Sequence, residues 1–178
     1  TPFLLVDLSL IKQKFEEMVM YFPNAKIHYA MKANPGVPVI NLLRDLGSNF
    51  DCASIFELDR VFDSGVTPDR VSYGNTIKKA AHIKYAYDKG VRLYATDSKA
   101  DIQKIAENAP GSRVFVRILV EGGDTAAWPL SRKFGCHPDM AIDLLVNAKK
   151  LGLEPYGISF HVGSQQKDIA VWDDALSK

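Results

Sequence analysis

The feature that most constrains the fold of this chain is a repeated alternation of short apolar runs with longer amphipathic stretches. Each apolar run is long enough for one strand, and the first four units recur about every 22 residues. We predict strands at residues 27–32, 49–53, 70–74, 91–96, 113–120 and 156–162, and helices at 35–46, 55–64, 77–89, 98–108, 138–151 and from about 168. Such alternation is typical of parallel strands that are joined by helical crossovers.

The spacing also helps to choose between two arrangements of such strands. An open doubly wound sheet is one possibility, but no G-x-G-x-x-G motif follows the first strand to bind a dinucleotide. The near-constant repeat favours a closed barrel instead. We therefore predict an α/β fold of the TIM (β/α)8 type, of which about six units are present in this chain.

A segment of different character precedes the first repeat. It contains an apolar run at 3–6, which we predict to be a strand, and a helix that Ser9 can cap. The apolar residues of this helix have helical spacing, and they are Leu10, Phe15, Met18, Val19 and Phe22. We therefore divide the chain into an N-terminal strand and helix at 1–25 and an incomplete barrel domain at 26–178. Because the chain starts without methionine and stops within a predicted helix, we expect it to be part of a longer protein.

Composition argues against several classes of protein. The 22 basic and 21 acidic residues leave a net charge of +1, without the basic surplus of a nucleic-acid-binding protein. Cys52 and Cys136 make no disulfide framework, which favours a reducing, cytoplasmic setting. No apolar stretch reaches membrane-spanning length, and no signal peptide is recognisable. We therefore expect a cytoplasmic protein with neither a nucleic-acid nor a membrane partner, and we predict no metal site.

Alternation along the strands predicts which side chains face inward. Successive strand residues point to opposite faces, and we expect the fully apolar set to pack under the helices. The inward sets are then His28, Ala30 and Lys32 in the first strand, Phe115, Arg117 and Leu119 in the fifth, and Ser159, His161 and Gly163 in the sixth. Lys32, Asp51, Arg117 and His161 converge at the carboxyl-terminal mouth, where barrels of this type build their active sites.

A structural role competes with a functional one for each of these residues alone. Lys32 could extend its charged head into water, and the others could form a cap, a core ion pair or a satisfied buried histidine. The convergence of four such residues favours a functional site. We expect Lys32 to be desolvated at the buried end of its strand and near an aspartate, an environment that suits a covalent bond to an aldehyde cofactor.

Other polar residues receive a structural interpretation. Asn75 and Asp97 end predicted strands and each precedes a helix, so we interpret them as helix caps. The remaining histidines, which we interpret as structural, are His28, His82 and His137. The phase of Cys52 points toward the helices, and we assign it no chemistry.

An ordered set of motifs resembles one enzyme family. "YAMKANP", "FDCAS", "YGNTIKK", "VRI", "LSRKFG" and "GISFHVGS" follow one another as in the basic amino acid decarboxylases, the group IV pyridoxal-phosphate enzymes of the alanine-racemase-like barrel class. The resemblance implies decarboxylation of L-ornithine to putrescine, with L-lysine to cadaverine as the second choice, and hence polyamine biosynthesis. A decarboxylase of diaminopimelate ranks third, because a glycine-rich stretch usually stands there in place of FDCAS. A racemase of the same class fits the motifs less well, and a non-catalytic homologue that only binds partners is the alternative from a different class.

Roles for single residues follow from the same resemblance. It implies that Lys32 forms the Schiff base with pyridoxal 5′-phosphate and that Asp51 lies beside the cofactor and this lysine. It further implies that His161 stacks on the pyridine ring, that Ser164 binds the phosphate and that Arg117 lies beneath the cofactor.

The resemblance also bears on assembly. It implies a homodimer with shared active sites, in which Lys133 of LSRKFG meets an acidic residue of the second subunit. The loop at 121–138 carries Trp128, Leu130 and Phe134, which are too apolar for a purely solvated loop, and they either fold back over the barrel or belong to such an interface. A glycine-rich phosphate loop, a carboxylate for the pyridine nitrogen, the residues that bind the substrate side chain and a C-terminal β domain would all lie beyond position 178. We therefore expect the isolated chain to be inactive.

Overall fold

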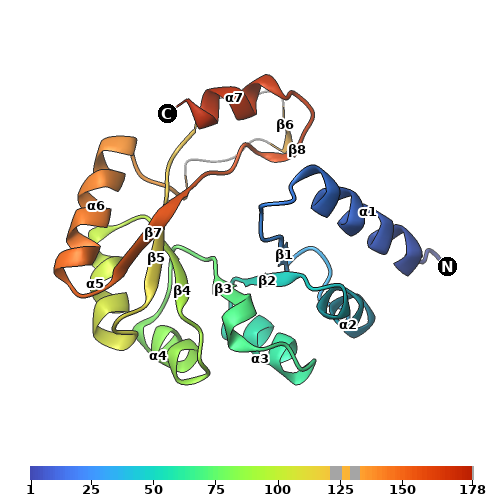
Figure 1. Cartoon of the computed structure of the whole chain (residues 1–178), viewed down its shortest axis with the longest axis horizontal. Helices are drawn as coiled ribbons and strands as arrows, with labels where there is room; N and C mark the ends of the chain where they lie inside the picture. Colours follow the sequence, from blue (N-terminus) through green and yellow to red (C-terminus); the bar gives the residue numbers. More distant parts are fainter. Residues whose placement is uncertain (121–125, 129–132, 178) are drawn as a thin grey trace.

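Helices and strands alternate along nearly the whole chain in the computed structural model, which describes residues 1–120, 126–128 and 133–177 (Figure 1). The helices are α1 (Leu8–Tyr21), α2 (Val37–Asp45), α3 (Ile55–Asp63), α4 (Ala80–Asp88), α5 (Lys99–Asn108), α6 (Pro138–Lys150) and α7 (Ala170–Leu176). The strands are β1 (His28–Ala30), β2 (Asn49–Cys52), β3 (Val71–Tyr73), β4 (Leu93–Thr96), β5 (Arg113–Arg117), β6 (Ala126–Trp128), β7 (Glu154–Ser159) and β8 (Ser164–Gln166). A short 3-10 helix, Pro68–Arg70, precedes β3.

Six strands form one parallel sheet in the order β1-β2-β3-β4-β5-β7. The sheet curves, and α2 to α6 lie along its outer side (Figure 1). A doubly wound sheet would reverse its strand order at a switch point, whereas here the order in space follows the order in sequence. This is the winding of a (β/α)8 barrel, and the predicted fold class is confirmed as six of its strands.

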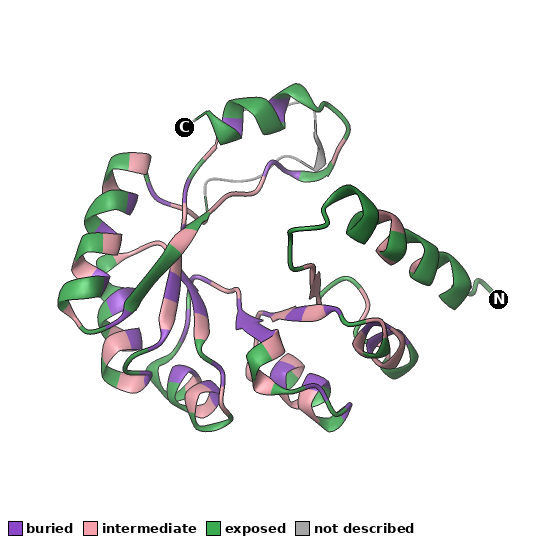
Figure 2. Cartoon of the chain, viewed as in Figure 1, coloured by how far each residue is buried: buried purple, intermediate pink, exposed green. Residues whose placement is uncertain are grey.

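The hydrophobic core lies between the sheet and its outer helices (Figure 2). Every other residue of β5, Val114 and Val116, is fully buried there, as the predicted alternation requires. The helices contribute one apolar face each, with the buried residues Val39, Ile40, Leu43, Leu58, Val61, Ile83, Ala86, Ile102, Ile105, Ala141, Leu144 and Ala148. Burial of each large side chain stabilises the fold by about 1.5–3 kcal/mol relative to exposure.

The ends of the helices follow the expected chemistry. Ser54 and Ser98 cap α3 and α5, and each hydroxyl accepts a hydrogen bond from the backbone three residues later. Glycines in the left-handed region follow α2, α3, α4 and α6, with φ of 89° at Gly47, 82° at Gly65, 97° at Gly90 and 79° at Gly152.

Two predictions for the N-terminal segment are wrong. Residues 3–6 form no strand, since no described strand lies beside them to supply hydrogen bonds, and Phe3 and Leu4 are 88% and 85% exposed. The cap of α1 is Asp7 rather than Ser9, because the Asp7 carboxylate accepts hydrogen bonds from the backbone of Ser9 and Leu10. Ser9 is the second residue of the helix and donates its own hydroxyl to Asp7.

The region after β5 contains an element that the sequence did not predict. Strands β6 and β8 form a separate antiparallel pair. After β8, helix α7 packs Val171 and Ala175 against Val162. Residues 121–125 and 129–132 lie outside the described residues, so the prediction for Leu130 stays untested, as does the one for the Trp128 side chain.

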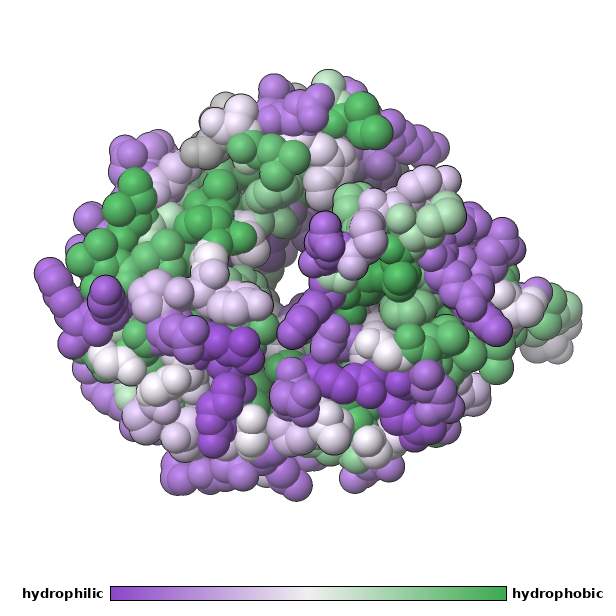
Figure 3. Space-filling view, in the orientation of Figure 1, coloured by the Kyte–Doolittle hydropathy of each residue, from purple (hydrophilic) through white to green (hydrophobic). Residues whose placement is uncertain are grey.

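The face opposite the outer helices is open. The space-filling view shows the molecule hollowed near its centre, with hydrophobic and hydrophilic side chains at the border of the hollow (Figure 3). The outer strands β1 and β7 each have one neighbour in the sheet. Among the described residues, no helix has the length and hydropathy to cross a bilayer.

Candidate functional site

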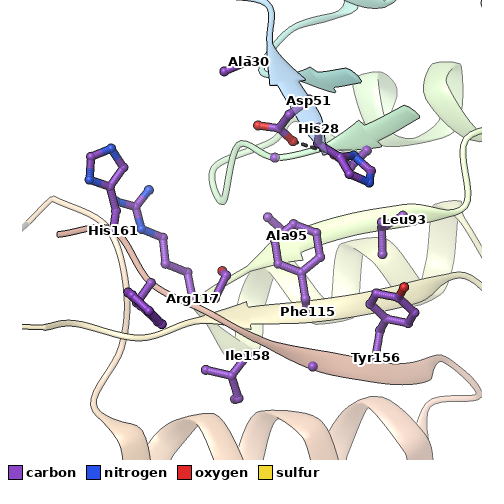
Figure 4. A pocket seen from close by; sticks show the side chains of 15 residues that line it. His28, Ala30, Asp51, Leu93, Ala95, Phe115, Arg117, Tyr156, Ile158 and His161 are labelled. Carbon is purple, nitrogen blue, oxygen red and sulfur yellow. Dashed lines mark hydrogen bonds between the residues drawn. The ribbon is translucent and has the colours of Figure 1, made fainter. Parts of the chain in front are cut away.

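Two adjoining cavities lie on the inner side of the sheet. The inner cavity, of about 490 Å³, is bordered by β1 to β5 and β7, and the mouth cavity, of about 370 Å³, lies where these strands end. Asp51, Gly74, Arg117 and His161 border both, so the cavities form one continuous site. In the close view, Asp51 and His28 lie on one side and Arg117 and His161 on the other (Figure 4).

The predicted inward phase holds for Asp51, Arg117 and His161. Arg117 is the last residue of β5 and His161 follows β7, and both border the two cavities. Asp51 enters from β2, whereas its neighbour Cys52 is fully buried in the core, where burial raises the pKa of the thiol and keeps it protonated. The structure thus brings together all four residues that the sequence predicted to converge, since Lys32 also borders the mouth cavity.

The expected environment of Lys32 is wrong in one respect. Strand β1 ends at Ala30, and a turn that is closed by a hydrogen bond from the Ala33 N–H to the Ala30 carbonyl follows at once. Lys32 lies in this turn and is exposed rather than desolvated. Lys32 and Asp51 both border the mouth cavity, and the positive charge of Lys32 acts to lower the pKa of Asp51.

Asp51 is a mostly buried carboxylate with one defined hydrogen bond. The Ser72 hydroxyl donates to its Oδ1 over 2.6 Å. Burial raises the pKa of Asp51 above its usual range, while the Ser72 hydrogen bond and the Lys32 charge act in the opposite direction and Glu57 adds to the rise. A carboxylate in this setting can hold or accept a proton near the Lys32 amine.

Space for this carboxylate depends on Gly74. A Cβ atom at position 74 would lie 2.2 Å from Oδ1 and 2.3 Å from Oδ2 of Asp51. No side chain can occupy that volume while Asp51 keeps its position. The glycine of the YGNTIKK motif therefore permits Asp51 to point into the site.

His161 is held as a neutral ring with a defined tautomer. The backbone N–H of Gly163 donates to its Nδ1 over 2.9 Å, so Nδ1 is the acceptor and Nε2 carries the proton. Burial lowers the pKa of His161, and the positive charges of Arg117 and Lys32 lower it further. The His161 ring that borders the two cavities is therefore flat and uncharged.

Arg117 supplies a cation whose setting involves Asp97. Burial lowers the pKa of Arg117 and Asp97 opposes this effect. The guanidinium lies 5.5 Å from the centre of the Phe134 ring. Oδ2 of Asp97 accepts a hydrogen bond of 2.8 Å from the Gly135 N–H, which fixes the segment that carries Phe134.

Both predicted caps at strand ends are wrong. Ser98 rather than Asp97 caps α5, and α4 begins after Lys79 without a side-chain cap. Asn75 instead closes its own turn, accepting from the Ile77 N–H over 3.1 Å. The two polar side chains serve the loops around the mouth cavity because each helix starts later than the sequence suggested.

Two of the predicted site residues border neither cavity. Ser164 is the first residue of β8 and is exposed, at the antiparallel pair with β6. Lys133 is exposed just before Phe134. The structure therefore places both beside the site rather than in it, and their predicted roles remain predictions.

Sequence reasoning missed four contributors to the site: His28, Glu57, Ser72 and Gly74. His28, which we interpreted as structural, borders the inner cavity and contacts Ser72, and Gly74 makes room for Asp51. Glu57 borders the mouth cavity. For His28 a signal existed, since its strand phase matches that of Lys32; for Ser72 and Gly74 only the register of three strands reveals the proximity.

The residues around the two cavities fit a flat aromatic aldehyde that carries an anionic group. Lys32 offers a primary amine that can bond to the aldehyde, and the neutral ring of His161 offers a flat surface. Arg117 offers a cation to the anionic part. Pyridoxal phosphate has this combination of groups.

Comparisons with known proteins agree with this chemistry. Residues 8–178 match the family model described as the pyridoxal-binding domain of pyridoxal-dependent decarboxylases. The chain is 40% identical to a lysine/ornithine decarboxylase of Selenomonas ruminantium over 176 residues, which is 99% of this chain and 44% of that protein. It is 41% identical to an ornithine decarboxylase of Saccharomyces cerevisiae, with 94% of this chain and 36% of that protein covered. Antizyme inhibitor 2 of Xenopus laevis is 35% identical, over 98% of this chain and 38% of that protein.

Solved structures give the same picture. Lysine decarboxylase from Selenomonas ruminantium has a TM-score of 0.91 at 39% identity, over 99% of this chain and 46% of that chain. The arginine decarboxylase of Paramecium bursaria Chlorella virus has a TM-score of 0.90 at 32% identity, over 96% of this chain and 46% of that chain. A variant of the Selenomonas enzyme, solved in complex with PLP, reaches 0.94 at 40% identity, again over 99% of this chain and 46% of that chain. The chain spans less than half the length of the curated relatives it matches.

Proposed function

Because this chain belongs to the pyridoxal-dependent decarboxylases, as their pyridoxal-binding domain, we propose that the protein that carries it removes carbon dioxide from a basic amino acid. L-Ornithine, which would give putrescine, is our first choice, and L-lysine, which would give cadaverine, is the second. The single observation that carries the proposal is the convergence of Lys32, Asp51, Arg117 and His161 on one cavity at the carboxyl ends of the strands.

Pyridoxal phosphate, when bound, supplies an electron-withdrawing ring that accepts the electron pair left as carbon dioxide departs. The chain's own residues would hold and orient it. Lys32 lies in an exposed turn, within reach of an incoming aldehyde or amine. Asp51, beside it, would accept a hydrogen bond and hold or release a proton at its carboxylate.

Three further residues would complete the hold on the cofactor. The uncharged ring of His161 would pack against the aromatic plane, and Arg117 would neutralise negative charge below it. For Ser164 we propose a hydrogen bond to the phosphate, delivered from the β8 end of the site. The prior resemblance of the GISFHVGS motif supports this last role.

The choice of a basic amino acid rests on the names of the relatives. Ornithine, lysine and arginine decarboxylases all occur among the similar proteins. The four converging residues handle groups that every α-amino acid shares, so they leave the length of the substrate side chain open. Diaminopimelate, the third choice, is therefore included as an outcome of the experiment.

A non-catalytic, partner-binding protein is the second candidate function. Its support is the similarity to antizyme inhibitor 2 of Xenopus laevis, which is named as an inhibitor of another protein rather than as an enzyme. The presence of Lys32, Asp51 and His161 at one cavity favours the catalytic proposal. The two functions make opposite predictions about cofactor binding.

The deciding experiment offers ornithine, lysine, arginine and diaminopimelate separately to the purified full-length protein and measures carbon dioxide release. We expect release from ornithine, with or without lysine, and loss of release by orders of magnitude in Lys32→Ala. Lys99→Ala, an exposed lysine at the start of α5, is the matched control and should behave as the unaltered protein. Release from diaminopimelate alone would contradict the substrate assignment, and a protein that binds no pyridoxal phosphate would support the partner-binding function.

For the assembly we propose a homodimer in which exposed Lys133 meets an acidic residue of a second copy. Lys133→Ala should then weaken dimerisation and carbon dioxide release together, whereas Lys99→Ala should change neither. Sedimentation at several protein concentrations measures the dimer, and an intact, active dimer at the lowest concentration would rule out this role for Lys133.

A further inference from the structure

Three side chains from neighbouring strands form a chain of hydrogen bonds behind the site. The Ser72 hydroxyl on β3 lies 2.6 Å from Oδ1 of Asp51 on β2 and 3.2 Å from Nδ1 of His28 on β1. The strand register creates this contact, because Asp51 pairs with Ala30 on one side and with Ser72 on the other. Ser72 is only 3% exposed, so its hydroxyl depends on these partners for its hydrogen bonds.

The number of available protons determines which group donates and which accepts in each of these hydrogen bonds. A serine hydroxyl has one hydrogen to donate, and the ionised Asp51 carboxylate at 2.6 Å is its shortest acceptor. The competing acceptor, the Phe50 carbonyl oxygen, is 3.5 Å away. His28 must therefore act as the donor toward Ser72, which requires the tautomer with the proton on Nδ1.

We propose that Ser72 and His28 are positioning residues that orient the Asp51 carboxylate in the cofactor site and hold it in the ionised form. The hydrogen bond from Ser72 occupies Oδ1, and within the described residues Oδ2 has no hydrogen-bond partner, so that oxygen remains for a group in the mouth cavity. We call the hydrogen bonds that link His28, Ser72 and Asp51 the relay. Its role in catalysis rests on the proposed function, whereas the existence of the hydrogen bonds does not.

The charged groups around the relay are consistent with this direction. Asp51 faces Lys32 from the turn after β1 and Glu57 from α3, with Arg117 and His161 across the cavity. Burial is the main influence on His28 and lowers its pKa, a hydrogen bond with the Phe50 backbone acts to raise it, and the charge of Lys26 acts to lower it. A neutral His28 can donate a hydrogen bond to Ser72 without adding a positive charge to the site.

The proposal predicts that one of two similar serine variants changes the pH dependence of cofactor binding and that the other does not. We expect cofactor binding to weaken at low pH as Asp51 takes up a proton, and we call this part of the binding profile the acid limb. Ser72→Ala removes the hydrogen bond that favours the ionised Asp51 carboxylate. The apparent pKa of the acid limb should therefore rise by about one pH unit. Ser112→Ala is the matched control, because Ser112 is also buried but its hydroxyl has no hydrogen-bond partner among the described residues. It should leave the acid limb unchanged.

His28 allows a test by rescue. His28→Leu removes the donor and should move the acid limb in the same direction as Ser72→Ala, by a smaller amount. His28→Asn places an amide N–H where Nδ1 stood and should restore most of the unaltered profile. A purely structural histidine would show similar profiles for both replacements.

The experiment has two arms on the full-length protein. In the cofactor-free protein, long-range ¹⁵N–¹H NMR of the histidine rings, assigned with His28→Asn, should show the Nδ1–H tautomer for His28. In the loaded protein, the visible absorption of bound pyridoxal phosphate across pH should give the acid limbs described above. An Nε2–H tautomer, or equal acid limbs for Ser72→Ala and Ser112→Ala, would overturn the relay. If the protein binds no cofactor, the proposed function fails and the NMR arm alone decides whether the relay exists.

Discussion

Position 74 illustrates how a single residue limits the site. The backbone there runs so close to Asp51 that even one methyl group would overlap both carboxylate oxygens. The geometry has nothing to do with a special φ angle, since Gly74 is outside the left-handed region. The requirement for glycine comes from space alone.

We predict that Gly74→Ala lowers the free energy of unfolding by about 1–3 kcal/mol and weakens pyridoxal phosphate binding, because Asp51 or its strand must move. Urea unfolding and a cofactor titration measure the two effects. Gly157→Ala is the matched control for stability, as a Cβ there would meet nothing within 4 Å. Equal unfolding midpoints for the two variants would show that Asp51 does not occupy the volume assigned to it.

The two histidines of the site give stability a pH dependence. Burial lowers the pKa of both His28 and His161 below the ordinary value of 6.5, so below pH 6.5 the unfolded chain binds more protons than the folded one. Stability is therefore fully present above pH 6.5 and falls as the pH drops from there toward the lowered values. The raised pKa of Asp51 acts in the opposite direction, from its ordinary value of 3.8 upward.

We expect the free energy of unfolding, measured by urea titration, to be smaller at pH 5.5 than at pH 7.5. His161→Asn should reduce this difference, because the variant lacks one of the two groups that take up a proton on unfolding. His82→Asn, on the outer helix α4, is the control and should keep the difference. A stability that does not change between the two pH values would contradict the buried, neutral state of both rings.

At the scale of elements, one buried ion pair joins the loop after β3 to β4 and α5. Lys78 uses all three of its donors, to the Asn75 carbonyl at 2.8 Å, the Ala95 carbonyl at 2.6 Å and Oδ2 of Asp101 at 2.7 Å. The lysine and aspartate side chains are 0% and 3% exposed. Because Asn75 borders the mouth cavity, this pair sets the position of one wall of the site.

Asp101→Asn should cost about 3–5 kcal/mol in the free energy of unfolding, since it leaves the buried Lys78 charge without its partner. Asp88→Asn breaks an exposed pair with Lys84, in which both side chains are more than half exposed, and should cost about 0–1 kcal/mol. Chemical denaturation of the two variants measures the contrast. Similar costs would mean that water reaches Lys78 in solution.

The same elements show what the sequence can predict. Alternation in β5 predicted that Arg117 faces inward and Val116 outward, because a two-residue period leaves only two choices. No such rule separates Lys78 from Lys79, adjacent in YGNTIKK, yet the first is buried and the second exposed. That difference arises from contacts with β4 and α5, which lie about twenty residues away along the chain.

The sequence also did not predict where some helices and strands begin and end, or that Lys32 is exposed. The pattern could place Lys32 near Asp51 but not show that β1 ends two residues earlier, because a turn and a strand end share the same local composition. Asp97 and Ser98 are both good caps, and the choice between them depends on the Gly135 N–H, which lies in a distant segment. The relay of His28, Ser72 and Asp51 needs the register of three strands and could not be predicted from any single one.

At the scale of the whole molecule, the two outer strands of the sheet favour association with other chains. β1 and β7 each present one edge without a strand neighbour in the described chain, and edges of this kind pair with other chains. Exposed apolar residues add to this tendency, among them Phe3, Leu4, Leu5, Ile158 and Trp172. A complete barrel needs eight strands to remove such edges.

We therefore predict that residues 1–178, expressed alone, associate or stay loosely folded and release no carbon dioxide from ornithine. Light scattering, thermal unfolding and a carbon dioxide assay measure the three properties, and the full-length protein is the reference. A monomer that unfolds cooperatively and decarboxylates ornithine would contradict the need for eight strands. It would also contradict the expectation that residues beyond position 178 are required for activity.

The agreement between strand order and chain order has a consequence for how the molecule is made. Each new strand emerging from the ribosome finds its sheet neighbour already synthesised, so the sheet can grow from one edge during translation without waiting for distant segments. The same order implies a gradient in amide hydrogen exchange, slowest in β3 and β4 and fastest in the last strands added and the first. The two edge strands, which are the first and the last of the sheet to be synthesised, should therefore open before the central ones.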